Sequence, residues 1–169
     1  YGFSSYNGFV TKNESVDGAW AQVESQYQRR FDLIGNLVAS VKGTFEQEQT
    51  VFGELAQARA AYSGAKTVDQ KIAAANGVES GLARLLAVVE NYPQLRSVET
   101  VQSLMTEIAG TENRIAVERM RFNEVIRSYN TSVKRFPGVI FASLFGFKER
   151  VYFEAEAGSE KAPKVDLSN

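Results

Sequence analysis

Six charged side chains fall within the apolar faces of predicted helices, and they are the residues best placed to do chemistry. They are three arginines and three glutamates: Arg30, Glu48, Arg59, Glu79, Glu112 and Arg119. An unpaired charge in a protein interior is costly, so these residues are expected to pair across helices. Arginine suits such pairing because its planar guanidinium can bind a carboxylate through two parallel hydrogen bonds. The pattern predicts either a polar network that fixes helix register or a ligand-binding or proton-handling site.

The missing residue types narrow the chemistry. The 169 residues include no cysteine and no histidine, which excludes disulfides, thiol nucleophiles and Ser-His-Asp sites. Di-iron bundles use Glu-x-x-His on two helices, so Glu48, Glu79 and Glu112 are not predicted to form such a centre. An all-carboxylate magnesium or calcium site is the remaining metal alternative. With no phosphate-binding glycine loop either, we expect no enzyme and no cofactor.

The overall charge gives no indication of nucleic acid as a partner. The chain has 19 basic and 20 acidic residues, a formal net charge of -1, and no apolar run long enough to span a bilayer. One local exception is the end of the third predicted helix, where Arg119, Arg121, Arg127, Lys134 and Arg135 make the chain basic. These residues either complement the helix dipole and solvate the helix or bind anionic lipid or a partner.

Heptad repeats of apolar residues predict the elements that position these charges. The first helix is expected from Thr11 or Ser15 to Tyr62, with Ser15 or Asp17 as its N-cap. A connection at 63–69, where Thr67 or Asp69 caps the next helix, leads into a second helix over 69–91 that ends before Pro93. The third helix begins at Ser97 or Glu99. The repeats are carried by Trp20, Tyr27, Ile34 and Val41 in the first helix and by Val101, Ile108, Ile115, Phe122, Tyr129 and Phe136 in the third.

These helices predict an all-α protein, an elongated antiparallel bundle of three long helices plus a short C-terminal helix. The short helix corresponds to the apolar run 139–147 and is expected to lie over one end of the bundle. The bundle proper is expected over 11–153, followed by a loosely ordered tail over 154–169. Residues 1–10 hold four aromatics and are either a frayed terminus or the interfacial end of a removed membrane helix.

A second set of polar residues on the first helix points away from its apolar stripe. Arg29, Asp32 and Asn36 project outward while Arg30 projects inward. In a simple bundle these three side chains are free to contact another molecule, so they are the candidate interaction face.

The inward charges carry a separate expectation. If they hold the bundle together, replacing Glu112 by Gln is expected to cost stability.

Ordered short motifs over nearly the whole chain resemble those of the LemA family of bacterial proteins. The motifs are Tyr6-Asn7-Gly8-Phe9-Val10, Ala19-Trp20, Gln26-Tyr27-Gln28-Arg29-Arg30, Asp32-Leu33-Ile34, Asn36-Leu37-Val38, Val41-Lys42-Gly43, Ala58-Arg59-Ala60, Arg84-Leu85-Leu86, Tyr92-Pro93, Thr111-Glu112-Asn113-Arg114-Ile115-Ala116, Tyr129-Asn130-Thr131, Phe136-Pro137, Phe145-Gly146-Phe147 and Tyr152-Phe153-Glu154-Ala155. The sequence departs from the family at Gly35, where proline is usual, and at Gln47, where histidine is usual.

The resemblance implies a helical bundle attached to the bacterial inner membrane by a single N-terminal segment, with no catalytic residues to carry over. It favours residues 1–10 as the exit of a removed membrane anchor. The expected function is a non-enzymatic scaffold or protein-interaction module of the cell envelope, which self-associates or binds an envelope protein. A binding or catalytic pocket lined by the interior arginines and glutamates is the alternative. The sequence leaves open on which side of the membrane the bundle lies.

Overall fold

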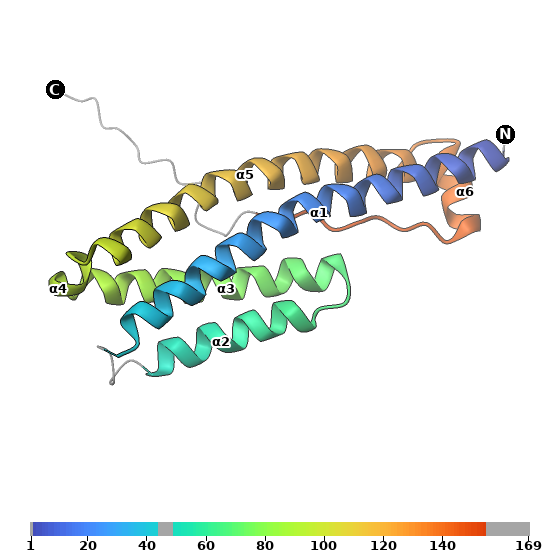
Figure 1. Ribbon diagram of the computed structural model, residues 1–169. Coiled ribbons are helices and arrows are strands. Elements are labelled where there is room, and N and C mark those ends of the chain that lie inside the picture. The colour runs from blue at the N-terminus through green and yellow to red at the C-terminus, as the bar shows by residue number, and fades with distance from the viewer. Residues whose placement is uncertain (1, 44–48, 155–169) are drawn as a thin grey trace, which may run out of the picture.

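The computed structural model describes residues 2–43 and 49–154, and within those ranges every regular element is a helix. The elements are α1 (Gly2–Val41), α2 (Gln49–Gly64), α3 (Val68–Glu90), α4 (Pro93–Arg96), α5 (Glu99–Lys134) and α6 (Gly138–Phe145). Figure 1 shows an elongated bundle in which α1, α2, α3 and α5 alternate in direction. The all-helical prediction is confirmed.

The antiparallel pair of α1 and α5 forms the long axis of the molecule (Figure 1). Trp20, Tyr27, Ile34 and Val41 of the first heptad are all buried, and so are the first five heptad positions of α5, from Val101 to Tyr129. A repeat of seven residues keeps one stripe of each helix facing its neighbour along the whole contact. The two stripes therefore form one continuous core.

The predicted single helix from residue 11 or 15 to Tyr62 is wrong. The helix begins at Gly2, so Ser15 and Asp17 are interior residues of it rather than caps, and it ends at Val41. A turn follows at Lys42 and Gly43, where glycine is a poor helix former. Folding back at this point lets α2 bury Leu55 and Tyr62 against the core, which a straight continuation of α1 would leave without a neighbour.

The α2–α3 hairpin packs beside the half of the α1–α5 pair that contains the end of α1 and the start of α5. The hydroxyl of Thr67 accepts a hydrogen bond from the Gln70 backbone N–H at 3.2 Å, so the predicted cap and the predicted second helix are confirmed. Close approach of α2 and α3 depends on Gly81, where a Cβ would lie only 3.0 Å from Leu55 Cδ1. Among the described helices, only α3 is long and apolar enough to cross a membrane. Its buried residues belong to the core of the bundle, and the core helix of a soluble protein can have the same length and composition.

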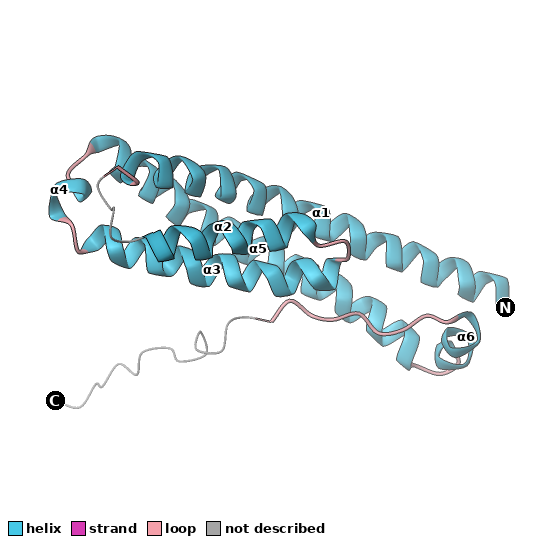
Figure 2. Cartoon of the chain, turned by 90° about the horizontal axis from the view of Figure 1, so that it is seen from below, coloured by secondary structure: helices cyan, strands magenta, loops and turns pink. Residues whose placement is uncertain are grey.

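The other half of the α1–α5 pair extends past the hairpin and is closed by α6, as predicted for the run 139–147 (Figure 2). The α5 helix ends at Lys134, so Phe136 lies beyond it and is 80% exposed. Its predicted place in the apolar stripe is therefore wrong. Gly146 adopts a left-handed conformation, φ 77°, that ends α6 and turns the chain back along the bundle.

After α6 an extended segment, residues 147–154, returns along α5 (Figure 2). The Asn130 side chain donates to the Arg150 carbonyl and accepts from its N–H, and Asn123 holds the backbone of Phe153 in the same way. Seven helical residues rise about 10.5 Å, and three extended residues span about 10 Å. The two asparagines therefore match the spacing of this return segment, which the sequence patterns did not predict.

Candidate functional site

The buried pair of Arg30 and Glu79 lies at the centre of the candidate site. Arg30 projects from the core face of α1 with 4% of its side chain exposed, and its Nη2 lies 2.9 Å from Glu79 Oε2 on α3. The same nitrogen lies 3.9 Å from Glu112 Oε2 of α5. The pair joins two helices whose backbones make few direct contacts, so it ties the hairpin to α1. Arg30 Nε is also buried, without a hydrogen-bond partner in the described part of the chain.

A pocket of about 380 Å³ opens beside this pair, between α1, α3, α5 and the return segment. Its lining residues are Arg30, Asn76, Glu79, Glu112, Ile115, Ala116, Arg119, Met120, Asn123 and Phe153. Glu112 lies at the mouth with 72% of its side chain exposed. The sequence pattern predicted Glu112 inside the bundle, and its exposure differs from that prediction because none of the described helices packs over this face of α5.

Arg119 forms another wall of the pocket through the return segment. Its guanidinium lies over the Phe153 ring at 4.0 Å, and its Nη2 donates to the Glu154 carbonyl at 2.6 Å. The Phe153 ring in turn stacks on Trp20 and Tyr27. Arg119 therefore binds the last part of the return segment, and this role could not be predicted because that segment has no periodic pattern.

The structure brings four of the six predicted interior charges to one place and puts a fifth, Arg59, elsewhere. Arg30, Glu79, Glu112 and Arg119 line the same pocket. Arg59 lies on α2, and its guanidinium faces α1. Its Nη1 would lie 3.4 Å from a Cβ placed on residue 35. At that distance a Cβ on residue 35 would be in ordinary van der Waals contact with the Arg59 side chain. Glu48 lies outside the described residues.

Sequence reasoning did not assign the pocket residues Asn76, Met120, Asn123 and Phe153 to a site. Asn123 follows the buried heptad residue Phe122, a position where polar side chains are ordinary, so the sequence pattern did not indicate it. Phe153 lies in a non-periodic segment, and it becomes a core residue only because the chain turns back at Gly146.

The predicted interaction face lies on the surface of α1. Arg29, Asp32 and Asn36 are all exposed. Arg29 is engaged with Glu107 of α5, Nη2 to Oε2 at 3.4 Å, so it is not available in the way the outer position suggested. No hydrogen bond or ion pair joins the side chains of Asp32 and Asn36 to another described residue.

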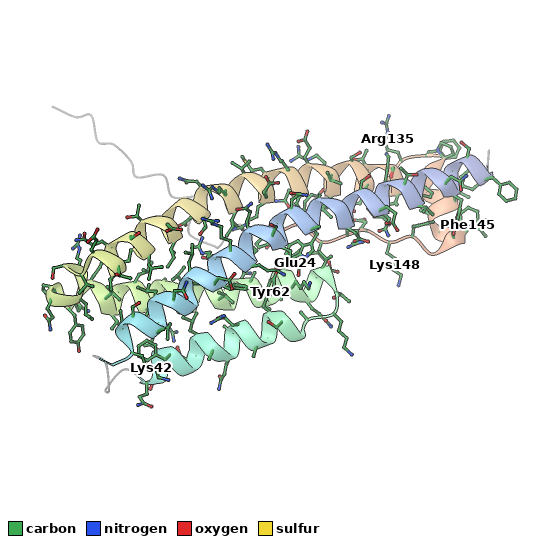
Figure 3. The ribbon with its side chains drawn as sticks, in the orientation of Figure 1. Glu24, Lys42, Tyr62, Arg135, Phe145 and Lys148 are labelled. Atoms are coloured by element: carbon green, nitrogen blue, oxygen red, sulfur yellow. The ribbon has the colours of Figure 1, made fainter. Side chains whose placement is uncertain are left out.

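A buried tyrosine near the end of α2, Tyr62, packs against the side of α1. The Tyr62 ring packs edge-on against Phe31 at 4.9 Å and lies near Glu24 and Tyr27 (Figure 3). Burial, with a smaller contribution from the charge of Glu24, raises the Tyr62 pKa well above the usual range for tyrosine. Its hydroxyl has no hydrogen-bond partner among the residues described, so the phenol contributes packing rather than acid–base chemistry.

Electrostatically the pocket is balanced, with two arginines and two glutamates. The described residues include no group of three or more acidic side chains arranged to hold a metal ion. Such a pocket suits a small ligand that carries both signs of charge, or serves only to tie helices together.

Comparison with known proteins shows to which family the chain belongs. The model of the LemA family matches residues 19–167. The chain belongs to the LemA family. Among its curated relatives, Magnetosome protein MamQ 1 of Paramagnetospirillum magneticum is 28% identical over 184 residues, covering 92% of this chain. Magnetosome protein MamQ of Magnetospirillum gryphiswaldense is 30% identical over 180 residues, covering 90% of this chain. In both cases the match covers 66% of the relative, so the chain spans just under two thirds of their length. The resemblance drawn from the sequence motifs is confirmed.

Proposed function

We propose that this chain is the helical domain of a membrane-anchored scaffold or protein-interaction module of the bacterial cell envelope, without enzymatic activity. The observation that carries the proposal is the use of the interior charges. Arg30 of α1 is almost wholly buried and binds Glu79 of α3, so its charge serves to hold the two helices together. Membership of the LemA family supports attachment to the inner membrane by a single segment.

The outer face of α1 is the part of this scaffold that we expect to meet a partner or a second copy. Asp32 and Asn36 are exposed on the last third of the helix α1, beside the Arg29–Glu107 pair. Polar side chains held on a rigid element can form specific hydrogen bonds at little entropic cost. Self-association and binding of an envelope protein both remain within this proposal.

Two experiments on the full-length protein in its native cells test the proposal. Fractionation should find the protein in membranes, released by detergent and not by high salt. A photo-crosslinking amino acid at position 32 or 36 should then give discrete products, identified by mass spectrometry. The matched control places the same amino acid at Gln57, which is exposed on α2. A soluble protein would contradict the anchoring, and identical products from all three positions would contradict the α1 face.

A small-molecule site is the second candidate, because the buried Arg30 Nε has no hydrogen-bond partner within the described residues and borders the pocket. Its ligand would carry both charges, as a free amino acid does. In thermal-shift screening with amino acids, stabilisation should be lost in Arg119→Gln and kept in Arg114→Gln, an exposed arginine of α5 outside the pocket. Absence of any stabilisation in the wild type would refute this candidate.

A further inference from the structure

Exposed apolar side chains gather at one end of the bundle. This end, which we call the apolar end, comprises residues 2–13 and 125–148, that is, the start of α1, the last turns of α5, the corner after it and α6 (Figure 1). Its exposed large apolar residues are Phe3, Tyr6, Val10, Phe136, Val139, Ile140, Leu144 and Phe145. Phe3, Phe136 and Leu144 are the most exposed, at 90%, 80% and 73%. The surface helix of a soluble protein normally turns mostly polar residues outward, whereas α6 exposes Val139, Ile140 and Leu144.

The apolar end is held together by its own aromatic contacts. The Tyr6 ring packs edge-on against Phe145 at 5.2 Å and against Phe147 at 5.8 Å, and Phe9 contacts Phe147 at 5.2 Å. Through Ala142, which is buried, α6 is fixed to the α1–α5 pair. The outward side chains of α6 are therefore presented on a fixed helix.

Charge is distributed unevenly between this end and the rest of the chain. The two segments of the apolar end contain five basic residues and no acidic residue: Lys12, Arg127, Lys134, Arg135 and Lys148. Since the whole chain has a formal charge of -1 and this end is +5, the remaining residues together are -6. Three carboxylates lie close by: Glu149 in an ion pair with Lys134 at 2.8 Å, Glu124 in the hollow that Lys12 lines, and Glu14, which follows the first segment on α1. The end keeps a net charge of +2 when all three are counted against its five basic residues.

Two of the basic side chains flank the apolar ones. Figure 3 shows Arg135 and Lys148 pointing out on opposite sides of the bundle, with Phe145 nearer the tip. Aromatic and aliphatic side chains ringed by lysine and arginine are typical of surfaces that rest in the interfacial layer of an anionic membrane. The apolar groups enter the layer, and the cations contact the headgroups.

We propose that the apolar end docks on an anionic lipid surface, with Phe3, Phe136 and Leu144 entering the interfacial layer and the five basic residues facing its headgroups. This rests on the proposed function and deepens it, since it adds a lipid contact made by the folded bundle itself, through α6 and the corner before it, to the proposed anchoring segment. A second copy fits less well, because two ends of this charge repel each other when apposed. An anionic membrane supplies the complementary charge and a fluid layer that accepts apolar groups from three separate segments.

Vesicle flotation of the 169-residue chain tests the docking. Vesicles of phosphatidylcholine with about one-third phosphatidylglycerol should carry the chain, and vesicles of phosphatidylcholine alone should not. Raising salt from about 0.1 M to about 0.5 M should weaken binding, because surface charges are then screened. Leu144→Asp should lower the partition coefficient by at least about tenfold, since it removes an inserted side chain and adds a repelled charge. The matched control is Met120→Asp, an apolar residue of similar exposure, 66%, away from this end.

Depth-dependent quenching gives a second measurement that does not rely on a disruptive variant. Trp20 is 3% exposed, so brominated lipids should leave the wild-type fluorescence unchanged. Leu144→Trp should be quenched and Met120→Trp should not. Absence of binding to the anionic vesicles, equal loss in both aspartate variants, or equal quenching in both tryptophan variants would overturn the docking. Light scattering that finds a dimer broken by Leu144→Asp would assign the end to a second copy instead.

The result is separable from the proposed function. If the full-length protein fractionates with membranes but the 169-residue chain does not bind anionic vesicles, the anchored scaffold is supported and the docking proposal is refuted. If the full-length protein is soluble, the scaffold fails whatever the vesicles show.

Discussion

Removing the charge of Glu79 should destabilise the bundle far more than removing that of Glu112. Both carboxylates lie near the same arginine nitrogen, but Glu79 is 2.9 Å away and 20% exposed, whereas Glu112 is 3.9 Å away and 72% exposed. Glu79→Gln leaves Arg30 as a charge with 4% exposure and no ionised partner within 3.5 Å among the described residues. Breaking a buried pair from one side costs about 3–5 kcal/mol.

We expect about 2–3 kcal/mol for Glu79→Gln, below that range because glutamine keeps an acceptor oxygen and the site is partly open to solvent. For Glu112→Gln we expect at most about 0.5 kcal/mol, as for an exposed ion pair. This reverses the expectation from sequence that replacing Glu112 costs stability. In a domain of this size the Glu79 loss corresponds to a fall in Tm of about 4–12 °C.

Urea denaturation followed by far-ultraviolet circular dichroism measures both variants, with the slope of the transition checking that both unfold in the same way. The double variant Arg30→Met, Glu79→Leu should recover most of the loss, because apolar residues replace both members of the pair. Equal midpoints for Glu79→Gln and Glu112→Gln, or a double variant as unstable as the single one, would refute the role given to the pair.

Three further substitutions test other parts of the fold. Asn130→Ala removes two hydrogen bonds to the backbone of Arg150 and should cost about 2–3 kcal/mol, with faster proteolysis of the return segment; unchanged proteolysis would contradict the clamp. Gly81→Ala should destabilise by about 1–3 kcal/mol, because its methyl group meets Leu55, so a gain in helix stability there would be the contrary result. Burial raises the Tyr62 pKa, so above pH of about 10 the unfolded chain releases a proton that the folded chain retains, and stability should fall as pH rises. Tyr62→Phe should be neutral or stabilising at pH 7 and should lose less stability between about pH 9 and about pH 11 than the wild type.

Local and periodic signals in the sequence were enough to predict the helices and much of the core. Seven-residue repeats need only one apolar stripe per helix, so Tyr27 and Phe122 could be placed in the core without knowing what they contact. Thr67 and Pro93 act on their immediate neighbours, and the boundaries they set agree with the structure. The family resemblance rests on the same kind of local motif.

The break after Val41 could not be decided this way. The apolar pattern and helix propensity continue through this region, and glycine at position 43 costs too little to end a helix by itself. The energy of packing α2 against α3 and the core favours the fold back. That energy depends on residues distant in sequence, such as Leu55 against Gly81.

The sequence by itself determined which charges face inward on α1 and α3, because a side chain's direction on a helix follows from its position. Whether an inward charge is buried depends on what covers it, and only the tertiary structure decided that. Arg30 is covered and paired, while Glu112, at an equivalent place on α5, opens to solvent. The return segment shows the same limit, since an extended chain held by the side chains of Asn123 and Asn130 has no period of its own to detect.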